Sequence, residues 1–131
     1  MNKTKAGQVF TREKMESLFP IEKSNAFFEA LYGGSEESHF DIQLEFQGTE
    51  ENNLIFLFNL VQRPGGCLSC SMTYGLPNVL ARHPVINISG LVHDIASALG
   101  IDPAETSWTL GNTRQESSEI HRIPLVISVN P

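Results

Sequence analysis

The sequence predicts an α+β fold: a single domain with a mainly antiparallel sheet of four or five strands and three or four short helices. Two runs predict the sheet, an alternating segment at 40–46 and an apolar segment at 54–61, joined by a short polar link. Hairpin-like connections dominate over strand–helix–strand units, which favours an antiparallel sheet. A length of 131 residues, of which 40% are hydrophobic, suits one domain with its own core.

The first predicted strand has one apolar and one polar face. Phe40, Ile42, Leu44 and Phe46 alternate with Asp41, Gln43 and Glu45. Gly48–Asn53 is a polar turn, and Leu54–Val61 follows as a nearly continuous apolar run. Such a run is typical of a central strand that is buried on both faces.

The C-terminal segment predicts another two-faced strand. His121, Ile123, Leu125, Ile127 and Val129 fall on one face. Pro124 lacks a backbone donor, so we expect this strand at a sheet edge or with a bulge. A shorter strand is expected at Thr106–Leu110, around Trp108.

Helix signals occur on both sides of the hairpin. Thr11 is a suitable N-cap for a helix through Leu18, and Ser24 for a second helix that ends at Gly33-Gly34.

After the hairpin, Pro77 suits the first position of a helix through Arg82, and Ser89 suits the N-cap of a helix through Leu99. Residues 1–10 are polar and interrupted by Gly7, so we expect a flexible arm there and a single domain over 11–131.

Charge and targeting signals narrow the function classes. The net charge is −6 and Lys and Arg form no cluster, which argues against nucleic acid and anionic membrane surfaces as partners. There is no secretory signal, and the longest apolar run is too short to cross a bilayer. With only two cysteines, the sequence favours a cytoplasmic protein with reduced thiols.

Cys67 and Cys70 form a CxxC motif, which chelates a soft metal, forms a redox-active disulfide or packs as two small apolar side chains. His83 follows at a spacing that suits a third zinc ligand, and His121 or His93 would have to complete the site. No convincing fourth ligand is present. We therefore expect no bound cofactor, with zinc as the alternative.

The segment Arg63–Pro84 is rich in residues that recognise ligands. Arg63 and Arg82 supply donors for anions, Tyr74 supplies a flat surface, and His83 lies beside Arg82. Trp108, farther along the chain, is a further candidate. The alternative is a packed loop that covers one end of the sheet.

Three functional hypotheses follow. The first is a non-enzymatic binding domain, homodimeric, whose 63–84 surface takes a small anionic ligand or a protein partner. The second is a metal protein that uses Cys67, Cys70 and His83. The third is an enzyme of unspecified class, with His83 or His121 as the proton carrier, since His121 begins the apolar face of its strand and a buried imidazole needs a partner.

Overall fold

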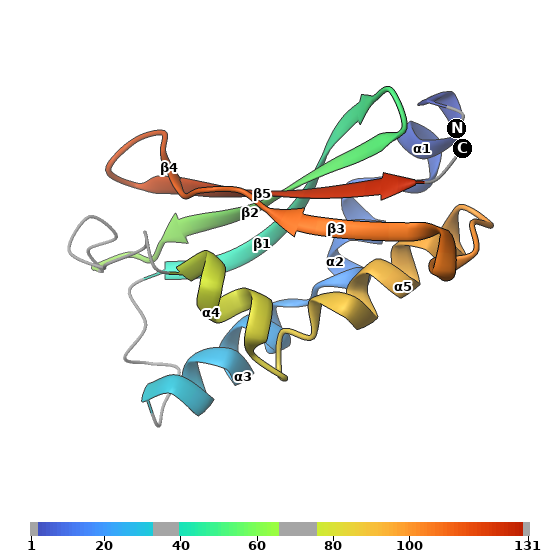
Figure 1. Ribbon diagram of the computed structural model, residues 1–131. Helices are drawn as coiled ribbons and strands as arrows, with labels where there is room; N and C mark the ends of the chain where they lie inside the picture. Colours follow the sequence, from blue (N-terminus) through green and yellow to red (C-terminus); the bar gives the residue numbers. More distant parts are fainter. Residues whose placement is uncertain (1–2, 33–39, 66–75, 130–131) are drawn as a thin grey trace.

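The computed structural model describes residues 3–32, 40–65 and 76–129, and it confirms the α+β fold (Figure 1). The elements, in chain order, are α1 (Lys3–Val9), α2 (Arg12–Leu18), α3 (Ile21–Tyr32), β1 (Phe40–Glu50), β2 (Asn53–Gln62), α4 (Leu76–Arg82), α5 (Ile88–Ala98), the short 3₁₀ helix η3 (Pro103–Glu105), β3 (Thr106–Leu110), β4 (Arg114–Gln115) and β5 (Ile120–Val129). None of the described helices is long and apolar enough to span a membrane.

The sheet has the order β1-β2-β5-β3, with β4 pairing the other half of the same edge of β5, and every pairing is antiparallel. Helices α2 to α5 lie along one side of it (Figure 1). The core fills the space between this side and the helices. Its fully buried sheet residues include Phe56, Phe58, Ile123 and Leu125.

The predicted hairpin is confirmed, with a tighter turn than expected. Strand β1 pairs with β2 from Phe40↔Gln62 to Glu50↔Asn53, so only Glu51 and Asn52 form the turn. Glu51 adopts a left-handed conformation, with φ of 55°. A register shift between Phe46 and Gly48 adds a bulge to β1, after its apolar residues.

Pro124 does not place β5 at an edge or next to a bulge in its own strand, and this prediction is wrong. Strand β5 lies between β2 and the β3/β4 side. The proline falls where β3 has ended and β4 has not begun, opposite Gly111, whose N–H donates to the Pro124 carbonyl at 2.8 Å. The missing donor of Pro124 therefore faces this gap and costs no ladder hydrogen bond.

The N-terminal segment is a helix rather than the expected arm. Helix α1 occupies Lys3–Val9, and both Ala6 and Phe10 belong to the core. The Phe10 ring packs against the rings of Phe46 and Phe56, with centroids 5.1 and 5.2 Å apart. Burial of these two side chains holds the segment on the hairpin. The polar local sequence gave no indication of this burial.

Two helices do not begin at the N-cap residues that the sequence predicted. The expected cap at Thr11 is confirmed, since its side chain accepts from the Lys14 N–H. Helix α3 starts at Ile21, directly after Pro20, so Ser24 lies within it. Helix α5 is capped by Asn87, whose side chain accepts from the Gly90 N–H at 3.2 Å, and not by Ser89.

Truncation of a central aromatic side chain tests the core. Phe58 is fully buried and packs edge-on against Phe19, with ring centroids 5.5 Å apart. We expect Phe58→Ala to lower the free energy of unfolding by about 3–5 kcal/mol in urea melts, because the structure closes such a cavity only partly. Gln43→Ala, on the exposed face of β1, is the control and should change it by less than about 0.5 kcal/mol. Equal losses for the two variants would contradict the register.

Candidate functional site

The sequence-predicted residues at 63–84 are partly held by the fold itself. Arg63, just after β2, makes an ion pair with Asp41 of β1 at 2.7 Å, and its Nη2 also donates to the Asn25 side chain of α3 at 2.8 Å. The Arg63 and Asp41 side chains are only 23% and 28% exposed. Because its donors already have acceptors in the chain, Arg63 ties β1, β2 and α3 together.

His83 is also engaged within the chain. Its ring contacts Phe27 of α3 edge-on, with centroids 4.9 Å apart, and its Nδ1 accepts from the Val85 N–H at 3.2 Å. This hydrogen bond assigns the proton of the neutral ring to Nε2. A zinc-binding imidazole normally has the opposite arrangement, with its second nitrogen donating, so the geometry weighs against His83 as a ligand.

The other candidates do not gather around these two. Arg82 is exposed at the end of α4. Trp108 pairs with Ile127, which pairs with Leu54, so it lies across from the hairpin-turn end of β2, while Arg63 follows the opposite end of that strand. Along β2, Arg63 lies nine residues beyond Leu54, the residue level with Trp108, which is roughly 30 Å at the usual rise per residue of a strand. The structure does not bring Trp108 to the 63–84 segment.

Cys67, Cys70 and Tyr74 lie outside the described residues. Within the described part of the chain, no group of three or more metal-ligating side chains comes together. His93 is exposed on α5, with its Nδ1 3.9 Å from Asp94, too far for a hydrogen bond. The metal hypothesis for Cys67, Cys70 and His83 stays a prediction.

Two side chains among the described residues have shifted pKa values. His121 is buried as its pattern predicts, and desolvation lowers the pKa of its imidazole. Burial also lowers the pKa of the Lys23 ammonium, against the opposing attraction of Asp94. Neither group lines the pocket described next, and His121 reads as a neutral core residue.

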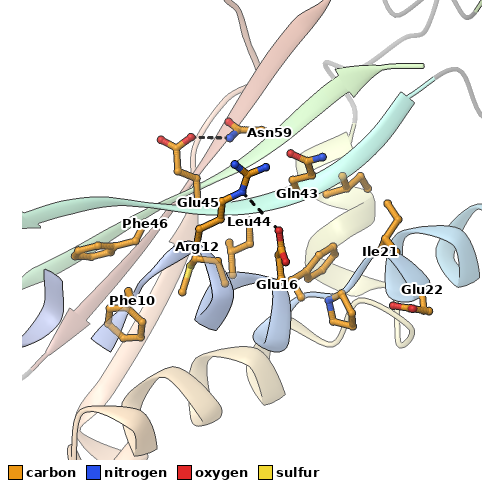
Figure 2. A pocket seen from close by; sticks show the side chains of 14 residues that line it. Phe10, Arg12, Glu16, Ile21, Glu22, Gln43, Leu44, Glu45, Phe46 and Asn59 are labelled. Atoms are coloured by element: carbon orange, nitrogen blue, oxygen red, sulfur yellow. Dashed lines mark hydrogen bonds and ion pairs between the residues drawn. The ribbon is translucent and has the colours of Figure 1, made fainter. Parts of the chain in front are cut away.

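A pocket of about 780 Å³ opens along the outer edge of β1, and sequence reasoning missed it (Figure 2). We call it the edge pocket. Its apolar base comes from the helices and from the core face of the strand: Phe10, Met15, Phe19, Ile42, Leu44 and Phe46. Its polar rim includes Arg12, Glu16, Glu22, Gln43, Glu45 and Asn59. Because β1 residues from both faces line it, the edge pocket wraps around the strand edge.

The backbone of β1 is available in this pocket. The Ile42 N–H points outward, because it donates to the buried Ser24 Oγ of α3 at 3.0 Å. Alternate residues of a strand point their backbone groups to the same side, so Leu44 and Phe46 also face the edge. In the described part of the chain, no helix or loop backbone bonds to these two residues.

The rim of the edge pocket is mainly acidic. It contains three carboxylates, of Glu16, Glu22 and Glu45, and one guanidinium, which lies 3.6 Å from Glu16 as an i,i+4 ion pair (Figure 2). Glu45 accepts a hydrogen bond from the Asn59 side chain at 2.8 Å. Ile21, 45% exposed, adds an apolar wall. The pocket therefore combines open backbone, apolar surface and negative charge.

Comparisons with protein-family models, with curated proteins and with solved structures gave no match. The arrangement of the described residues is therefore the basis for assigning a function.

The role of Arg63 is tested by paired substitutions. We expect Arg63→Gln to lower the free energy of unfolding by about 1–2 kcal/mol, because it leaves Asp41 and Asn25 without their shared donor. Arg82→Gln, an exposed arginine, is the matched control and should change it by less than about 0.5 kcal/mol. Denaturant melts measure both. Equal stability of the two variants would contradict a structural role for Arg63.

Proposed function

We propose that this chain is a non-enzymatic interaction domain of the cytoplasm that binds an extended protein segment in the edge pocket by adding a strand to β1. The observation that carries the proposal is the open backbone of Leu44 and Phe46 in a pocket with an apolar base and a polar rim. An edge strand with unpaired groups is a template for a further strand, and many peptide-binding domains use this mode.

The length of the open edge sets what the backbone can contribute. Ser24 occupies the Ile42 N–H, and the bulge after Phe46 interrupts the regular spacing. At least four groups remain: the Ile42 carbonyl, the N–H and the carbonyl of Leu44, and the N–H of Phe46. At about 1 kcal/mol each, they fall short of the roughly 8 kcal/mol of a micromolar complex. Side-chain contacts must supply the difference.

The rim defines the side chains that fit. In an added strand, residues opposite Leu44 and Phe46 would point to the helix side, where Ile21 and Phe46 offer apolar surface. The residue opposite Glu45 would lie on the other face, beside that carboxylate. The partner is therefore a segment that alternates apolar residues with Lys or Arg.

A second copy of the chain is a poorer occupant of this edge. Antiparallel self-pairing over Leu44–Phe46 would place Glu45 opposite its own counterpart, and like charges at directly opposed positions destabilise a sheet. The net charge of −6 adds repulsion between copies. The predicted homodimer stays a prediction and would need another surface.

Two synthetic peptides test the proposal, a seven-residue peptide that alternates valine with lysine and its counterpart with glutamate. We expect the lysine peptide to bind at least about tenfold more tightly in fluorescence polarisation at low salt, because its ammonium groups face Glu45. Methylating the peptide amides that face β1 should abolish binding, since it removes the donors of the added strand.

Charge-reversed variants separate the edge pocket from the overall charge. Glu45→Lys should weaken binding of the lysine peptide about tenfold, whereas Glu29→Lys, the same change at an exposed position of α3 outside the pocket, should not. The proposal fails if the lysine peptide does not bind at millimolar concentration, if both variants weaken it equally, or if amide methylation has no effect.

A further inference from the structure

Two arginines face one another across the last two strands of the sheet. Arg114 of β4 is paired directly with Arg122 of β5. Directly paired residues project from the same face of a sheet, so the two guanidinium groups share one face. Like charges at opposed positions repel, and this chain, with 15 acidic and 9 basic residues, offers carboxylates in excess.

Among the described residues, neither arginine forms an ion pair with a carboxylate. In the described part of the chain, the ion pairs of arginine involve Arg12 with Glu16 and Arg63 with Asp41, and none involves Arg114 or Arg122. The Arg122 Nε is buried and has no hydrogen-bond partner among the described groups. A buried charged donor without an acceptor destabilises the fold, so this one calls for an explanation.

The neighbouring strand does not supply the missing charge. Asn59 of β2 is paired with Arg122 and lies on the same face. Its amide nitrogen already donates to Glu45, and its Oδ1 is buried without a donor. Asn59 therefore separates Arg122 from the acidic residues of β1. Glu116 and Glu119 lie in the turn between β4 and β5, but among the described residues neither forms an ion pair with Arg114 or Arg122.

This face is the one that the helices leave open. The core-facing residues of β5 are the odd-numbered ones, from His121 to Ile127. Arg122 thus projects from the opposite face of the sheet. Helices α2 to α5 lie along the other side (Figure 1). Arg114 is exposed and Arg122 half-buried, so a small ligand can reach both from solvent.

We infer that Arg114 and Arg122 form a binding site for a phosphate group. Guanidinium groups bind oxyanions through paired N–H donors, and two of them side by side match the double charge and several oxygens of a phosphate. A single carboxylate offers one charge and two oxygens, which one arginine satisfies. The bound anion would remove the repulsion between the arginines and supply acceptors to their exposed guanidinium groups.

Titration with inorganic phosphate, at an ionic strength kept constant with sodium chloride, tests the site. We expect a saturable change in the side-chain Nε–H resonance of Arg122 at millimolar phosphate, and a rise in the melting temperature, because the ligand binds the folded state. Phenyl phosphate in a parallel arm distinguishes a phosphate ester from free phosphate as the preferred ligand.

Matched arginine variants assign the site. Arg114→Gln and Arg122→Gln should each weaken phosphate binding at least about tenfold, and Arg82→Gln, an exposed arginine on α4, should leave it unchanged. Without phosphate, Arg114→Gln should raise the melting temperature, since it removes the repulsion. This readout does not depend on Arg122→Gln folding.

The inference is overturned if phosphate gives no saturable change, or if sodium chloride alone reproduces the effect. It is equally overturned if Arg82→Gln weakens binding as much as Arg114→Gln, because the effect would then be one of general charge. None of these outcomes bears on the edge pocket, which the peptide titrations test separately.

Discussion

The pairing of β2 with β5 is the constraint on which the rest of the structure depends. The two strands run antiparallel from Asn53↔Ser128 to Val61↔Ile120, although nearly sixty residues of chain separate them. Their shared inner face carries the fully buried side chains on which the helices pack, and β1 and β3 extend the sheet on either side. Forming this ladder requires closing a long loop, so its stability must come from the apolar surface that the inner face buries.

Both proposed sites follow from placing β2 and β5 in the centre. Strand β1 becomes an outer edge, and because α3 reaches only the Ile42 end of it, Leu44 and Phe46 stay open within the edge pocket. The other edge is divided between β3 and β4, and the β4 half places Arg114 against Arg122. One face of the sheet carries the helices, and the arginines lie on the other.

Local patterns were sufficient for the sheet but not for its surroundings. Alternation in Phe40–Phe46 and in the C-terminal strand gives the buried face directly, since the side-chain period of a strand is two. Pro124 misleads because its missing donor is harmless opposite the gap at Gly111, a fact of pairing and not of sequence. Helix α1 was missed because its burial depends on Phe10 reaching aromatic rings on β1 and β2.

The candidate sites were harder to predict for the same reason. The partners of Arg63 lie 22 and 38 residues away in the sequence. The many ligand-binding residue types around Arg63 therefore suggested an external ligand, whereas Asp41 and Asn25 of the same chain accept its hydrogen bonds. The edge pocket joins Phe10 after α1, helix α2, the start of α3, strand β1 and one residue of β2, and no short sequence motif covers that combination. The facing arginines flank a short polar turn, so a hairpin register assigned to 114–122 would have found them.

The central claim is that β1 keeps an open backbone edge at Leu44 and Phe46, and residue-resolved amide hydrogen exchange tests it most directly. We expect the amides of Leu44 and Phe46 to exchange rapidly, while those of Gln43 and Glu45, which face β2 in the same strand, exchange slowly. The Ile42 amide, bonded to Ser24, should be protected as well. Slow exchange at Leu44 and Phe46, equal to that of Gln43 and Glu45, would show that the edge is already paired and would contradict the account.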